Sequence, residues 1–133
     1  MTVSLTHKRV VSLNLKTLSD GEVELKNNVR LTMGSELFLN SNHKNMIRVR
    51  YPVSLIIKDK IMIDMEYDFY FSATEEFTPD IIDSPLLRTK MPSLAYPYIK
   101  SYLDNLVFAS GYDSTTIPFL DFMEEPLELT PKD

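Results

Sequence analysis

The chain has 133 residues, of which 44% are apolar and 25% charged, close to the averages for globular proteins. This length suits one domain with a modest core, and the composition excludes wholesale disorder. The absence of cysteine excludes a disulfide scaffold, a cysteine nucleophile and thiolate metal ligands. The net charge of -5 argues against general nucleic-acid binding, which needs a positive surface.

The sequence carries no signal for a membrane or for a cofactor. Residues 1–20 lack the continuous apolar stretch of a signal peptide, and no apolar run is long enough to span a bilayer. Only two histidines are present, and they lie far apart; three glycines cannot build a phosphate-binding loop. We therefore expect a cytoplasmic protein without direct membrane insertion, without a metal and without a cofactor.

The first half of the chain alternates apolar and polar residues, as strands with one buried face do. This pattern predicts a weaker strand over residues 3–18, a long strand over 23–39, and two more over 47–57 and 61–72. Turn signals separate the four strands. Pro52 cannot donate a ladder hydrogen bond, so we expect a bulge or a sheet edge there. The prediction is a four-stranded antiparallel meander over about residues 3–72.

The second half changes to a helical period. Apolar residues recur at helical spacing from Ile99 to Val107, which predicts a helix that Pro97 opens and Gly111 ends. Residues 78–88 predict a short, broken helix, and residues 117–123 predict a short terminal helix.

These elements make a single domain with a helical part over residues 78–125 and an acidic tail over 126–133. The helices are expected to cover the odd-numbered face of the sheet, because no other element is available to bury it. The predicted fold class is α+β, a four-stranded antiparallel meander followed by helices packed on one face.

Three features of the helical half stand out: the run from Tyr96 to Leu106, the glycine at Gly111, and the residues Ile117-Pro118-Phe119 and Phe122-Met123. In these features the chain resembles the SecB export-chaperone family. The resemblance covers about residues 5–129. It implies an ATP-independent chaperone that binds unfolded or newly made polypeptides and assembles as a dimer or a homotetrameric dimer of dimers. Export members of the family dock on the SecA motor in protein transport, and other members hold an aggregation-prone antitoxin.

Two sets of residues are candidates for function. Asp64, Glu66 and Asp68 follow one another on the even-numbered face of the last strand, and the resemblance places Asp64 at an acidic position that contacts SecA. The alternatives for these carboxylates are a solvated surface and a divalent-metal site. The family's acidic contacts in the first strand would fall near Asn14 and Leu18, which carry no charge.

The second set is apolar. Five apolar side chains occupy even positions where a solvated sheet face would be polar, which is typical of an association surface. They are predicted to form an oligomer interface or a client-binding groove, to which the connector residue Phe77 would add: Phe38, Met46, Ile56, Met62 and Tyr70.

No arrangement of nucleophile, base and acid emerges, so we expect no enzymatic activity. The leading functional hypothesis is a SecB-type holdase for unfolded polypeptides. One alternative is a dedicated partner-binding module, such as an antitoxin chaperone or a phage accessory protein. The other is an architectural oligomeric subunit.

Overall fold

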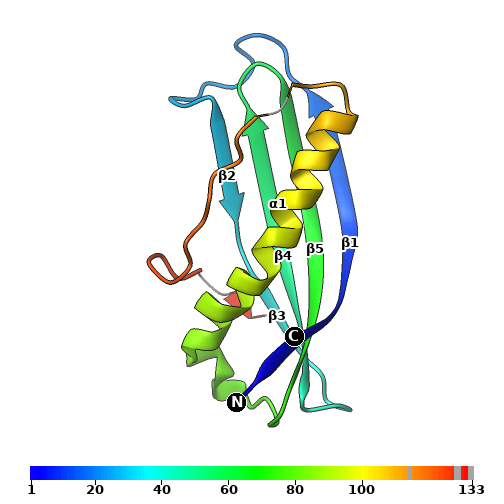
Figure 1. The fold of residues 1–133 in the computed structure, drawn as a ribbon, viewed down its shortest axis with the longest axis vertical. Coiled ribbons are helices and arrows are strands. Elements are labelled where there is room, and N and C mark those ends of the chain that lie inside the picture. Colours follow the sequence, from blue (N-terminus) through cyan, green and yellow to red (C-terminus); the bar gives the residue numbers. More distant parts are fainter. Residues whose placement is uncertain (114, 128–129, 132–133) are drawn as a thin grey trace.

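The computed structural model describes residues 1–113, 115–127 and 130–131. A long, twisted, antiparallel sheet is crossed on one face by a long helix (Figure 1). The elements in chain order are β1 (Val3–Thr17), β2 (Val29–Met33), β3 (Glu36–Leu39), β4 (Met46–Ile57), β5 (Ile61–Ala73), a 3₁₀ helix (Pro79–Asp83), a π-helical turn (Leu86–Lys90), α1 (Met91–Ala109) and β6 (Thr130–Pro131). The α+β class predicted from the sequence is confirmed.

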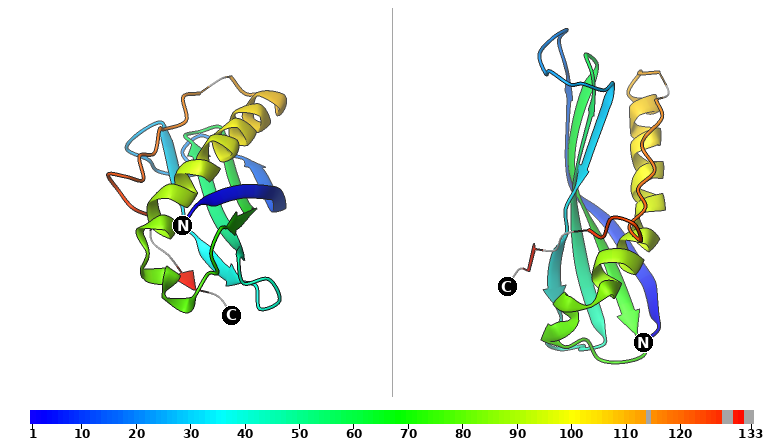
Figure 2. Two further views of the ribbon diagram at one scale, coloured as in Figure 1. Left: turned by 60° about the horizontal axis from the view of Figure 1, so that its bottom comes forward. Right: turned by 90° about the vertical axis from the view of Figure 1, so that its left-hand side faces the viewer.

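The strand order differs from the predicted meander. The order is β1-β5-β4-β3-β6, and β2 also pairs with β4, so the first long strand lies beside the last rather than beside its successor. Residues 18–28 carry the chain across the end of the sheet to the opposite edge (Figure 2). The meander prediction is wrong in this respect because alternation shows which face of a strand is buried, whereas it does not show which strand lies next to it.

The long strand predicted over residues 23–39 is broken into β2 and β3, and its first residues belong to the connector. The break at Gly34 lies opposite Pro52 of β4, to whose carbonyl oxygen the Gly34 amide donates a hydrogen bond of 2.9 Å. Pro52 has no N–H to return, so the ladder is weakened there. The predicted irregularity therefore lies in the neighbouring strand, because β4 itself is central and pairs with β5 in one continuous register.

The odd-numbered side chains of β4 and β5 face α1 and form the core, as predicted. Val49, Ile63 and Phe69 are fully buried, together with Ile99 and Leu103 of the helix. The sheet face opposite α1 is called the outer face below.

The start of α1 differs from the prediction, whereas its end agrees. The helix begins at Met91, six residues before Pro97, which lies inside it. Proline in a helix interior removes a backbone hydrogen bond, and α1 changes direction along its length (Figure 2). At the other end Gly111 has a φ of 92°, and the Tyr112 amide donates to the Val107 carbonyl at 3.2 Å. This is the predicted glycine termination.

No terminal helix forms over residues 117–123. Residues 115–127 instead run as an extended segment alongside α1 and then turn, and we call this segment the strap (Figure 1). Pro118 and Pro126 both disfavour a continuous helix. Of the predicted acidic tail, residues 128–129 and 132–133 lie outside the described part of the chain, and β6 pairs in parallel with β3.

One core side chain is expected to reduce the stability of the protein. Among the described residues, the Tyr51 hydroxyl is the buried side-chain group without a hydrogen-bond partner, and burial raises the pKa of Tyr51. Tyr51→Phe should therefore raise the free energy of unfolding in urea by about 1 kcal/mol, because it removes an unpaired polar group. The matched change Tyr96→Phe should lower it, since the Tyr96 hydroxyl donates to the Pro118 carbonyl. A destabilised Tyr51→Phe variant would contradict this account.

Candidate polypeptide-binding and assembly surfaces

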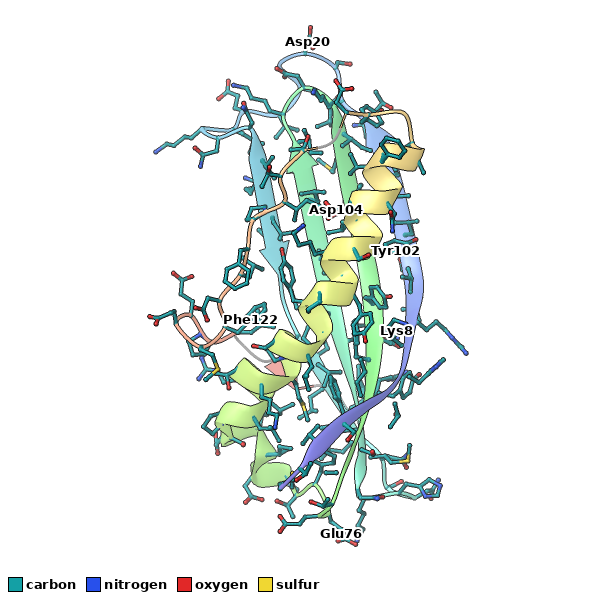
Figure 3. The ribbon with its side chains drawn as sticks, viewed as in Figure 1. Lys8, Asp20, Glu76, Tyr102, Asp104 and Phe122 are labelled. Carbon is teal, nitrogen blue, oxygen red and sulfur yellow. The ribbon has the colours of Figure 1, made fainter. Side chains whose placement is uncertain are left out.

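The strap is anchored to the body of the protein by two apolar side chains. Ile117 and Phe122 are 2% and 4% exposed and belong to the core. The Phe122 ring meets the Tyr96 ring of α1 edge to face, with centroids 5.9 Å apart, and Figure 3 shows Phe122 at the junction of strap and helix. These two side chains fix the strap to the core, whereas Phe119 and Met123 of the same segment are exposed.

Hydrogen bonds fix the strap at further points. The Tyr96 hydroxyl donates to the Pro118 carbonyl at 2.5 Å, and burial, with a smaller contribution from Asp104, raises the pKa of Tyr96 to about 12. At the far end of the strap the Leu127 amide donates to the Arg88 carbonyl at 2.8 Å, while Arg88 Nε donates to the Leu127 carbonyl at 3.0 Å. The Tyr96 hydroxyl remains a donor throughout the neutral pH range.

A groove of about 520 Å³ lies between β2 and the strap. Its apolar lining includes Leu31 and Met33 of β2 and Phe119 of the strap, and acidic side chains stand beside it at Asp121, Glu124 and Glu125. Two large apolar side chains of the strap are turned to solvent: Phe119 is 82% exposed and Met123 71% exposed. Large apolar groups gathered at a groove mark a binding surface for other apolar groups.

The β2 edge beside this groove has backbone groups that find no partner among the described residues. The Lys58 amide donates to the Asn28 carbonyl and the Gly34 amide to the Pro52 carbonyl, so even-numbered residues of this stretch bond to β4. In an antiparallel ladder the intervening residues then point their N–H and C=O groups away from the partner strand. The backbone of Val29, Leu31 and Met33 therefore faces the open edge, where an extended peptide can add as a further strand.

A second apolar surface lies along β1 and α1. Within the described chain β1 pairs with β5 alone, so its other edge is open over 15 residues. Leu94, Tyr98 and Phe108 share one face of α1 at helical spacing and are 37%, 45% and 70% exposed. Val11 and Leu13 of β1 are each 43% exposed. A long open strand beside exposed apolar residues is a pairing surface for another chain.

The predicted apolar residues divide into two groups. Phe38, Met46, Met62 and Tyr70 lie at even positions on the outer face and are half-buried, and their part in assembly or client binding stays a prediction. Ile56 is 4% exposed and Phe77 6% exposed, so neither is available to a client or a second subunit. Ile56, like Leu18, is buried outside the main core near the connector 18–28, whereas Phe77 joins the core itself.

The three predicted carboxylates also differ in their surroundings. Asp64 is exposed and the Glu66 side chain is 40% exposed, and both line a hollow of about 590 Å³ on the outer face. Asp68 is 1% exposed, because Arg50 grips both of its oxygens, with Nε donating at 2.7 Å and Nη2 at 3.0 Å. Asp68 is therefore a structural ion-pair partner and cannot serve on a solvated docking face.

Sequence reasoning missed the groove, because it interpreted residues 117–123 as a helix. The signals that favour a strap are Pro118 and Pro126 on either side of Phe119 and Met123. Among the described residues, no cluster of three potential metal-ligating side chains occurs. No described helix is long and apolar enough to cross a bilayer.

No protein-family model and no curated protein matches the sequence. Among solved structures, the SecB-like chaperone Rv1957 of Mycobacterium tuberculosis, in complex with a ChAD peptide from the Rv1956 HigA1 antitoxin, matches with a TM-score of 0.69 and 15% identity, over 90% of this chain and 91% of that chain. A protein of unknown function from Streptococcus agalactiae matches with a TM-score of 0.47 and 14% identity, over 90% and 98% of the two chains. The first match shows that this protein has a SecB-like fold.

Proposed function

We propose that the protein is an ATP-independent chaperone of SecB type that holds an extended, apolar segment of an unfolded or newly made polypeptide. The observation that carries the proposal is the groove between β2 and the strap, where the exposed Phe119 ring lies beside a strand edge that is open within the described residues. Backbone groups of β2 supply affinity for any extended segment, and the apolar walls select segments with apolar side chains. No catalytic step is part of the proposal.

The charge around the groove bears on the choice of client. Asp121, Glu124 and Glu125 stand beside it, and the whole chain has a net charge of -5. Acidic side chains attract basic residues and repel acidic ones, so clients with basic or neutral flanks are favoured. The proposed site of action is the cytoplasm, where unfolded and newly made chains are present.

Assembly of several copies would strengthen the binding of a client. The open edge of β1 and the exposed α1 residues Leu94, Tyr98 and Phe108 offer a surface on which two copies pair, giving a dimer or a dimer of dimers. Several grooves on one particle hold a long unfolded chain with an avidity that one groove lacks.

A second candidate function is that of a chaperone dedicated to one partner. It is favoured by the burial of Asp68 and by the uncharged residues Asn14 and Leu18, which weaken the case for an export role through a SecA-type motor. The chaperone Rv1957 was solved with a peptide from an antitoxin, which agrees with a dedicated role for this chain as well.

The groove is tested by removing the exposed Phe119 ring from its lining, together with Met123, which lies in the strap between the lining residues Phe122 and Glu124. The double variant Phe119→Ser, Met123→Ser should lose most of its suppression of aggregation, measured by light scattering with two unrelated denatured proteins, because apolar contact is the main attraction. Its unfolding midpoint should not change, since both side chains are exposed.

The matched control is Phe108→Ser, which removes an equally large and 70% exposed ring from α1, away from the groove. This control should keep the capacity of each subunit to bind a client. Suppression of both test proteins by the wild type supports a general holdase, and suppression of neither supports a dedicated partner. A double variant as active as the wild type would contradict the groove assignment.

A further inference from the structure

Arg48 lies on the outer face at the end of the sheet where β3 joins β4, and its side chain is 32% exposed. The guanidinium carbon stands 4.1 Å above the Phe38 ring, and Nη1 is 3.7 Å from Oδ2 of the buried Asp68. Stacking on an aromatic ring and attraction to a carboxylate restrict a guanidinium to one orientation. Arg48 is therefore held in position before any partner arrives.

The guanidinium of Arg48 nevertheless has no hydrogen-bond acceptor within the described chain. Its distance of 3.7 Å to Asp68 is too long for a hydrogen bond, and Arg50 already occupies both Asp68 oxygens. A guanidinium carries five N–H donors in a planar fork that matches a carboxylate. A rigid, partly exposed fork without an acceptor is suited to an incoming anion.

The hollow beside Arg48 also presents hydrogen-bond donors. It measures about 300 Å³ and is lined by Phe38, Leu39, Asn40, Ser41, Ile47, Arg48 and Tyr70. The side-chain oxygen Oδ1 of Asn40 accepts hydrogen bonds from the Asn42 and His43 amides, so the side-chain NH₂ group is left without a partner among the described residues. The Tyr70 hydroxyl adds another donor, and the Tyr70 ring is packed against His7 at 5.3 Å between centroids. The polar groups of the hollow therefore suit a ligand that supplies hydrogen-bond acceptors.

We propose that this hollow docks the carboxylate of an aspartate or glutamate in a segment of a protein partner, with Arg48 as the bidentate anchor. An apolar residue next to that carboxylate would pack on Leu39, which is 45% exposed. A polypeptide is favoured over a nucleic-acid phosphate, because four of the seven lining residues are apolar or aromatic and the chain has a net charge of -5. This surface lies on the outer face, apart from the groove of the strap, and does not depend on the proposed chaperone function.

The test follows the Arg48 Nε–Hε signal by NMR during titration with the peptide acetyl-leucyl-aspartyl-leucine amide. The expected result is a saturable shift, with at least about tenfold weaker binding of the asparaginyl analogue, since a charge-assisted bidentate bond is lost. Arg48→Gln should weaken binding of the aspartyl peptide by about tenfold or more, as measured by the fluorescence anisotropy of a dye-labelled version of the peptide. Arg48→Lys should weaken it as well, because lysine lacks the fork.

Two controls keep the outcome unambiguous. Arg30→Gln removes an exposed arginine from the other end of the outer face and should leave binding unchanged. Tyr70→Phe keeps the ring and removes one donor, and it should weaken binding several-fold without unfolding the protein. The proposal is overturned by equal binding of the two peptides, by inorganic phosphate shifting the signal as strongly as the aspartyl peptide, or by an equal loss in Arg30→Gln.

Discussion

Phe122→Ala is expected to lower the free energy of unfolding by about 3 kcal/mol and to abolish client binding together with it. The ring is 4% exposed and packs edge to face on Tyr96, so its removal leaves a cavity between the strap and α1. The strap forms one wall of the groove, and without this anchor the groove opens. Urea unfolding measures the first effect, and suppression of aggregation measures the second.

A comparison separates the loss of the groove from the loss of the fold. Leu103→Ala removes a fully buried side chain of α1 that belongs to the core and does not line the groove. This substitution should lower the free energy of unfolding by about as much as Phe122→Ala does. Under conditions where both variants remain folded, Leu103→Ala should still hold clients and Phe122→Ala should not. Equal activity of the two variants would show that the strap has no part in binding.

Asp68→Ala is expected to cost about 3 kcal/mol of stability, although Asp68 lies on the outer face. Removing it leaves Arg50, whose side chain is 24% exposed, without the carboxylate that accepts two of its hydrogen bonds. Breaking a buried pair is strongly destabilising because one charge remains buried without compensation. The partial exposure of Arg50 places the effect at the lower end of the usual range.

The double variant Arg50→Met, Asp68→Leu should regain most of this stability, since replacing both partners with apolar groups of similar size is often neutral. Urea unfolding of the single and double variants measures the difference. If Asp68→Ala unfolded at the wild-type midpoint, Asp68 would be a solvated side chain and could still belong to a docking face.

The sequence predicts β4 and β5 to within one residue at each end, since both strands are central and their alternation is enforced by a buried face. It also predicts the end of α1, because Gly111 adopts the positive φ that terminates a helix. The prediction fails where the strand order depends on pairing between residues far apart in the sequence, as in the position of β1 beside β5. The predicted start of the helix is wrong, because the prediction places Pro97 in the first turn, whereas Pro97 lies inside α1.

The candidate site was harder to predict than the fold, for a related reason. Alternation places Asp68 on the outer face correctly, but its burial depends on Arg50 of the neighbouring strand. Ile56 has the same alternation as Met46, yet Ile56 is buried and Met46 half-buried. The groove depends on the strap, and an irregular, extended segment of this kind has no periodicity from which the sequence could predict it.

The most direct measurement of the central claim is site-specific photo-cross-linking of the protein to an unfolded client. A photoreactive phenylalanine analogue would replace Phe119 in the strap, Phe108 on α1 or Asp64 on the outer face, one position at a time. We expect strong cross-links to a denatured protein from position 119 and weak ones from the other two, with competition by an unlabelled client. Cross-links from position 108 or 64 with none from 119 would contradict the assignment of the groove as the client-binding site.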